Sequence, residues 1–93
     1  MAITIELPGA LQAHASGSAS VVIEERCASV GEALAALAVQ WPGVLDRVLT
    51  ERGELRQHVN VFVDEENSRF IGGLNAPVPD GSTILILPAV SGG

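Results

Sequence analysis

The chain has 93 residues, of which 47% are hydrophobic and 17% are charged, so we expect a single domain, residues 1–93, with one core. It contains no run of 18 apolar residues and no basic stretch leading into an apolar one, which argues against a membrane span and a signal peptide and leaves the cytoplasm as the expected location. Eleven acidic residues against five arginines, with no lysine, give a net charge of −6 that disfavours nucleic acid and favours a partner protein with a basic surface.

The first elements predicted along the chain are two strands that form a hairpin. Residues 3–7 alternate between apolar and polar side chains, which is typical of a half-buried strand, and Pro8-Gly9 ends it. Residues 14–20 are small and polar and predict a turn. Residues 20–25 predict the second strand, with the odd-numbered positions on one face.

Cys27 is the only cysteine, which excludes an internal disulfide and a multi-cysteine metal site. We expect a small buried thiol at this position, because free cysteine behaves mostly as a buried apolar residue. The alternative is a reactive thiol whose pKa is lowered by the charge of Arg26.

A helix is predicted to begin after Ser29. Ser29 and Glu32 have the spacing of a capping box, in which each side chain accepts a hydrogen bond from the backbone near the other residue. An apolar stripe follows at helical spacing, formed by Val30, Leu34, Leu37 and Trp41. Pro42-Gly43 ends the helix. A short second helical turn is expected beyond it, with apolar side chains from Leu45, Val48 and Leu49.

Residues 59–63 predict a further strand, which ends at the acidic turn 64–67. Its two sets of alternating residues are Val59, Val61 and Val63 on one side and Asn60 and Phe62 on the other. We interpret the acidic residues 64–66 as a solvated turn rather than a metal site. Residues 68–82 are rich in loop formers, with a brief strand expected at residues 70–71.

Residues 83–88 predict the final strand. Because positions 84–87 are all apolar, we place this strand at the centre of the sheet. The order of elements predicts an α+β fold in which a mixed sheet packs on one main helix. One helix covers only one face, so Phe62, Leu85 and Leu87 should form an apolar docking face for a partner. The alternative is that loop residues such as Phe70 or Leu74 cover it.

The chain ends in a segment, residues 89–93, that is predicted to be a flexible tail. It follows Pro88 and consists of Ala89, Val90, Ser91, Gly92 and Gly93. The residues expected to enter the active site of a partner run from Pro88 to Gly92, and Gly93 is the residue expected to be modified. Five extended residues span at most about 17 Å, and the glycines keep the tip narrow, which suits insertion into the active site of another protein. A terminal carboxylate is ionised at neutral pH, so it needs activation, for instance as a mixed anhydride with AMP, before it can transfer an acyl group.

No catalytic apparatus of the chain's own is evident. His14 and His58 are isolated, no nucleophile stands at a recognisable spacing from them, and no glycine-rich phosphate loop is present. We therefore expect a protein substrate or a binder rather than an enzyme, with no bound cofactor and no metal.

Four segments, in this order, carry a resemblance: "ITIELPGAL", "ASVGEALAALAVQWPGV", "VNVFVDEENSRFIGGL" and "PDGSTILILPAVSGG". Together they resemble the MoaD/ThiS family of ubiquitin-like sulfur carriers, and most closely its CysO-type members. The resemblance implies a β-grasp fold. It also implies that an E1-like adenylyltransferase of the MoeB/MoeZ type, in some cases with a rhodanese domain, uses ATP to adenylate the carboxylate of Gly93. A sulfur source then converts the adenylate to a thiocarboxylate.

For a CysO-type member the resemblance implies a role in cysteine biosynthesis. The thiocarboxylate would attack an activated serine on a PLP-dependent cysteine synthase, and a metalloprotease would release the cysteine. Two alternatives within the family are the small subunit of molybdopterin synthase and a sulfur carrier for a thio-containing secondary metabolite. An alternative of another class is a non-conjugating β-grasp interaction module whose tail is inert.

Overall fold

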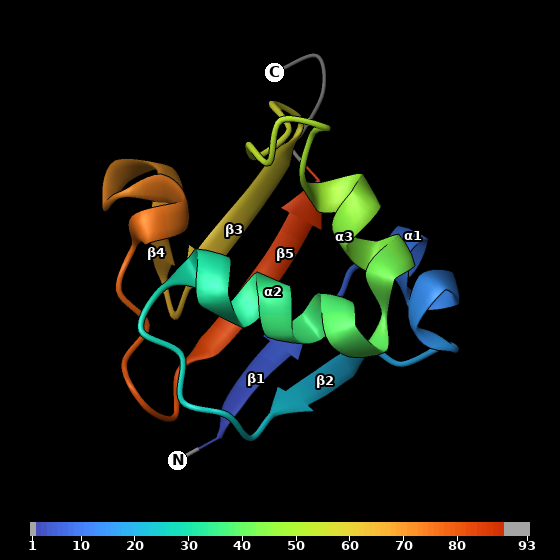
Figure 1. Ribbon diagram of the computed structural model, residues 1–93, viewed down its shortest axis with the longest axis horizontal. Coiled ribbons are helices and arrows are strands. Elements are labelled where there is room, and N and C mark those ends of the chain that lie inside the picture. Colours follow the sequence, from blue (N-terminus) through green and yellow to red (C-terminus); the bar gives the residue numbers. More distant parts are fainter. Residues whose placement is uncertain (1, 89–93) are drawn as a thin grey trace.

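The computed structural model describes residues 2–88, which form one five-stranded mixed sheet with helices on one face (Figure 1). The order of strands across the sheet is β2-β1-β5-β3-β4. The strands are β1 (Ile3–Glu6), β2 (Ser20–Ile23), β3 (Val59–Val63), β4 (Glu66–Asn67) and β5 (Thr83–Pro88), and the helices are α1 (Gly9–Gln12), α2 (Val30–Gln40) and α3 (Pro42–Val48). Short 3₁₀ turns are η1 (Ala13–Ala15), η2 (Ser68–Phe70) and η3 (Gly73–Asn75). The predicted α+β class is confirmed.

Strand β5 occupies the centre of the sheet, as its apolar sequence predicted. It pairs in parallel with β1, where Ile84 lies beside Ile5, and antiparallel with β3, where Ile86 lies beside Val61. The pairing with β3 extends to Pro88, the last described residue. The final strand is therefore held in the sheet up to the point where the C-terminal segment begins.

The N-terminal hairpin is present, since β1 pairs antiparallel with β2. Its connection is not the simple turn predicted at residues 14–20, because α1 and η1 occupy residues 9–15. Leu11 and Ala15 are four residues apart and both are buried, so these short helical turns pack on the core. The tight turn is confined to Ser16-Gly17, whose φ angles of 53° and 83° are left-handed.

Helix α2 begins at the predicted cap. The Ser29 hydroxyl accepts a hydrogen bond from the Glu32 N–H at 3.2 Å, and the Glu32 carboxylate accepts one from the Ala28 N–H at 3.0 Å, one residue before the predicted position. The apolar stripe is buried at its first three positions and half-buried at the last; its members are Val30, Leu34, Leu37 and Trp41.

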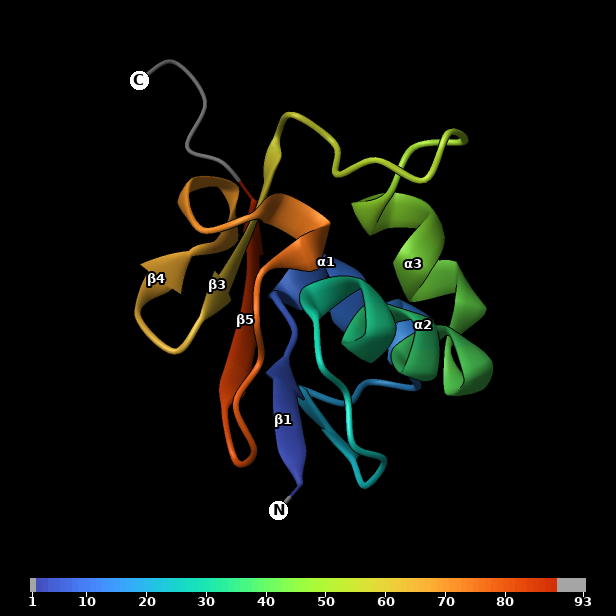
Figure 2. The same cartoon turned by 60° about the vertical axis from the view of Figure 1, so that its left-hand side comes forward.

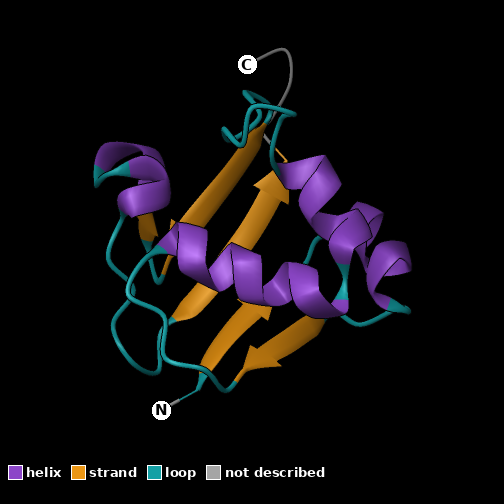
Figure 3. Cartoon of the chain, in the orientation of Figure 1, coloured by secondary structure: helices purple, strands orange, loops and turns teal. Residues whose placement is uncertain are grey.

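Pro42 ends α2 and also stands in the first turn of α3, where its missing N–H leaves no hydrogen bond unmade. The predicted second helical turn is thus a helix of seven residues. Its buried side chains are Val44 and Val48, whereas Leu45 and Leu49 are partly buried at its edge. Figure 3 shows α2 lying across the strands, with α3 beside its end.

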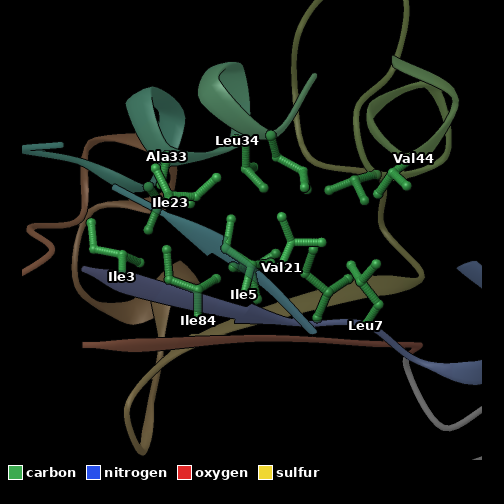
Figure 4. Packing of buried hydrophobic residues seen from close by; sticks show 14 of the residues in the cluster. Ile3, Ile5, Leu7, Val21, Ile23, Ala33, Leu34, Val44 and Ile84 are labelled. Atoms are coloured by element: carbon green, nitrogen blue, oxygen red, sulfur yellow. The ribbon is translucent and has the colours of Figure 1, made fainter. Parts of the chain in front are cut away.

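The core lies between α2 and the sheet. Figure 4 shows Ile3, Ile5 and Ile84 on the strands facing Ala33 and Leu34 of the helix, and all five side chains are fully buried. Close packing of this kind supplies most of the stability of a domain of this size.

The brief strand predicted at residues 70–71 is wrong. The short strand is β4, Glu66–Asn67, which pairs with β3 across a turn in which Asp64 adopts a left-handed φ of 55°. The strand ends because the Asn67 side chain accepts a hydrogen bond from the Arg69 N–H at 3.0 Å and caps η2.

Candidate functional site

In the part of the chain that the structure describes, the sheet has one face that no helix covers. Figure 2 shows α1, α2 and α3 on the same side of the strands. On β3 the valines are buried against the helices while Phe62 is only half-buried, and on β5 Ile84 and Ile86 are buried while Leu85 is half-buried. Leu87 is 37% exposed. The alternation of each strand therefore directs Phe62, Leu85 and Leu87 away from the core, as predicted; we call these three residues the open-face cluster.

The open-face cluster is contiguous in space. Phe62 lies directly beside Leu85, and Leu87 lies beside Asn60 in the same antiparallel pair. Cross-strand neighbours on one face are close enough for their side chains to touch. An apolar surface of this kind, surrounded by polar residues, is typical of a protein-binding site.

The alternative that the loop after β4 covers this face does not hold for the described residues. Ile71 and Leu74 pack against the core, and η3 lies against α2. Further along, the Val30 N–H donates to the carbonyl of Ala76 at 3.0 Å, which fixes the loop beside the start of α2. Phe70 is 85% exposed and covers nothing.

The predicted site residues of the C-terminal segment divide at the end of β5. Pro88 is described and pairs with Val59. The others lie outside the described residues: Ala89, Val90, Ser91, Gly92 and Gly93.

Beside Pro88 the surface is hollowed between α1, α3 and the ends of β3 and β5, with a volume of about 370 Å³. Two arginines, Arg47 and Arg56, line it together with His58. Sequence reasoning missed this hollow because its lining comes from four separate segments, and no spacing along the chain connects them.

The buried thiol predicted at Cys27 is confirmed, and the reactive alternative is not. Cys27 is buried, and its thiol donates to the carbonyl oxygen of Glu25 with 3.6 Å between Sγ and the oxygen. Burial raises the pKa of the Cys27 thiol, and the carboxylates of Glu25 and Glu32 raise it further. A thiol with a raised pKa is a poor nucleophile at neutral pH.

The acidic turn, residues 64–66, has a structural role. In the acidic turn, the Asp64 carboxylate accepts a hydrogen bond from the Thr83 N–H at 3.0 Å, which ties the turn to the start of β5. Among residues 2–88, no three histidine, cysteine or acidic side chains gather as a metal site would require. No helix in this part of the chain is long and apolar enough to cross a membrane.

The strand order, with a central β5 parallel to β1 and one main helix across the sheet, defines the β-grasp or ubiquitin-like class. Residues 5–93 match the family model described as the ThiS family. The chain belongs to the ThiS family, which confirms the family resemblance found in the sequence.

Individual relatives match over the whole chain. The sulfur carrier protein CysO of Mycobacterium tuberculosis is 34% identical over an alignment of 95 positions that covers all of both chains. A chain in the crystal structure of the Amycolatopsis orientalis BexX/CysO complex has a TM-score of 0.86 and 40% identity, covering 98% of this chain and 99% of that one. SAMP1 from Haloferax volcanii has a TM-score of 0.81 and 32% identity, with both chains fully covered.

Proposed function

We propose that this protein is a sulfur carrier whose Gly93 carboxylate is adenylated and then converted to a thiocarboxylate. The observation that carries the proposal is that the ThiS family match extends through residue 93, so that it includes the terminal Gly92-Gly93. The full-length similarity to a protein named sulfur carrier protein CysO supports the same function. A location in the cytoplasm, where ATP is available, fits this chemistry.

The chemistry explains why a partner enzyme is needed. An ionised carboxylate is a poor electrophile, so one of its oxygens first attacks the α-phosphorus of ATP and pyrophosphate leaves. Hydrosulfide then attacks the carbonyl carbon and AMP leaves, which gives the thiocarboxylate. Where a persulfide is the source, its terminal sulfur attacks and AMP leaves, and a thiol then reduces the resulting acyl disulfide to release the thiocarboxylate and a disulfide. An E1-like enzyme of the MoeB/MoeZ type, in some cases with a rhodanese domain, would catalyse both steps. The chain itself acts as the protein co-substrate.

The open-face cluster, Phe62, Leu85 and Leu87, is the proposed docking surface for these enzymes. A partner that grips this face holds the platform from which residues 89–93 enter its active site. In the Amycolatopsis relative, a CysO chain is found in a complex with a second protein, BexX. This precedent supports a protein-docking role for the fold.

Cysteine biosynthesis is the proposed destination of the sulfur, because sulfur carrier protein CysO is among the relatives that match over the full length. The acceptor would be a PLP-dependent cysteine synthase, followed by a metalloprotease that releases the product. The 40% identity to a CysO found with BexX favours, as a second candidate, a carrier that serves another sulfur-accepting enzyme.

Intact-mass spectrometry tests the proposal. After incubation with the E1-like enzyme of the same genome, ATP and a sulfide source, we expect a mass increase equal to the exchange of one oxygen atom for sulfur. Omission of ATP is the control. If every E1-like enzyme of that genome leaves the mass unchanged, the chain is an interaction module with an inert tail and the proposal is wrong.

Gly92→Val distinguishes an effect on the reacting terminus from an effect on the stability of the fold. A β-branched side chain next to the reacting residue should block entry of the tip and abolish the mass increase. The melting temperature should stay within about 1 °C of the parent, because we expect residue 92 to belong to a tail that contributes little to the fold. A variant that is sulfurated at the parental rate would refute the insertion of a narrow tip.

A further inference from the structure

The hollow beside Pro88 has an apolar floor and a charged rim. Its apolar lining includes Ala10 and Leu11 of α1 and Ile86 of β5. Arg47 of α3 and Arg56 of the segment before β3 supply the charge. In Figure 1, α1 and α3 lie beside the end of β5, so the hollow opens at the end of the sheet from which the C-terminal segment leaves.

Among the described residues, the two arginines of the hollow have no acidic partner. Arg47 donates to the carbonyl of Gly43 at 3.3 Å, and Arg56 donates to the carbonyl of Asp46 at 3.0 Å. The Arg56 Nε–H is buried and has no hydrogen-bond partner among the described residues. Within residues 2–88 neither guanidinium is in an ion pair; the pair found there joins Arg26 to Asp80.

Among the described residues, no acidic side chain lines the hollow, although Glu51 and Glu54 line a neighbouring hollow that shares Arg56 with it. Two further groups of acidic side chains lie at the other end of the sheet. The turn 64–66 is tied to the start of β5 through Thr83, and Glu24-Glu25 follow the end of β2 that pairs with the start of β1. These carboxylates therefore lie a full strand length from Pro88. The described lining of the hollow carries two guanidinium groups and no carboxylate, so it complements an acidic ligand.

We propose that the hollow binds a segment of the enzyme that receives the C-terminus, and that this segment presents an apolar side chain next to a carboxylate. The proposal rests on the proposed function. An enzyme that takes in residues 89–93 has to approach Pro88, and Pro88 itself lines the hollow. The apolar floor accepts the apolar side chain, and the guanidinium groups pair with the carboxylate. The enzyme thereby grips the protein on the helix side of the sheet end as well as on the open-face cluster.

Binding of the E1-like enzyme without ATP, measured by isothermal titration calorimetry, tests the proposal. Arg47→Glu should raise the Kd at least about tenfold, because it places a like charge against the partner carboxylate. Arg52→Glu is the matched control: it makes the same change of charge at an arginine outside this hollow and should change the Kd less than about threefold. Ala10→Leu fills part of the hollow without changing charge and should also weaken binding, with the melting temperature of each variant measured alongside.

The outcomes separate this proposal from the proposed function. Equal effects of Arg47→Glu and Arg52→Glu, or no effect of Arg47→Glu, overturn the hollow as a binding site. A parent protein that binds the enzyme but gains no mass with ATP and sulfide contradicts sulfur carriage, while the variants still decide the role of the hollow. A parent protein that does not bind at all overturns both.

A second measurement addresses the competing occupant, which is the terminal carboxylate of the same chain. Methyl NMR spectra of the isolated protein are compared with those of a variant lacking Gly92 and Gly93. The proposal predicts unchanged resonances for Leu11 and Val59, which line the hollow. Shifts of these methyl groups on deletion would place the chain's own terminus in the hollow and overturn the proposal.

Discussion

The two faces of the sheet are built from the same strands but differ in what they bury. On the covered face, Val61, Ile84 and Ile86 are at most 1% exposed. On the open face, their neighbours Phe62 and Leu85 are half-buried and Leu87 is more than a third exposed. The comparison teaches that alternate residues of the same two strands either fill the core or remain available to the proposed partner. Substitutions one position apart should therefore affect different properties.

The largest effect is expected for Ile84→Ala on the covered face. Removal of a fully buried isoleucine side chain leaves a cavity and should lower the free energy of unfolding by about 2–5 kcal/mol. Leu85→Ala, one residue along and half-exposed, is the control and should lower it by less than about 1.5 kcal/mol. Urea denaturation measures both. Equal losses would show that the two faces do not differ in the way described.

Phe62→Asp should next weaken partner binding through the open face. A charged side chain in place of an apolar aromatic one should raise the Kd for the E1-like enzyme at least about tenfold. Asn60→Asp adds the same charge on the same strand without removing apolar surface, so its effect should be smaller. Calorimetric titration gives both values, and an unchanged Kd for Phe62→Asp would exclude the open face as a docking surface.

Ser29→Ala tests the stability of α2, the helix on the covered face, without changing a core side chain. Loss of the hydrogen bond from the Glu32 N–H to the Ser29 hydroxyl should lower the free energy of unfolding by about 1 kcal/mol. Partner affinity should stay the same. Ser20→Ala, at an exposed strand position, is the control with an expected change within about 0.5 kcal/mol. A loss of affinity in Ser29→Ala would mean that the start of α2 also contacts the partner.

The smallest effect concerns the pH dependence contributed by Cys27. Its thiol has a raised pKa in the folded protein, so the unfolded chain loses this proton first as the pH rises. The stabilising contribution is complete below the ordinary thiol pKa and decreases as the pH rises from there toward the raised value. Denaturation curves between about pH 7 and about pH 10 should show a steeper decline for the parent than for Cys27→Ala. Parallel curves would contradict the raised pKa.

Most of the fold followed from the sequence because its longer elements carry clear periodic patterns. The alternation in residues 59–63 and the apolar run 83–88 gave the two central strands and also the open-face cluster. The capping box at Ser29 predicted the first residue of α2 correctly. Helix α1 and strand β4 were missed because four and two residues are too few to show a period, and each is held by tertiary contacts.

The candidate site likewise has one part that could be predicted from the sequence and one part that could not. The open face is a local property of two strands, and its orientation was readable from alternation. The hollow depends on side chains from α1, α3, the segment before β3 and the end of β5, which only the folded chain brings together. Long-range juxtaposition of this kind leaves no pattern in the sequence.

The parallel pairing of β1 with β5 has a practical consequence. Because the two strands run in the same direction, the first strand begins at the opposite end of the sheet from Pro88. A fusion partner or surface attachment placed ahead of Ile3 would therefore stand clear of the end from which the terminus leaves. An affinity tag appended after Gly93 would instead convert the terminal carboxyl group into an ordinary peptide bond.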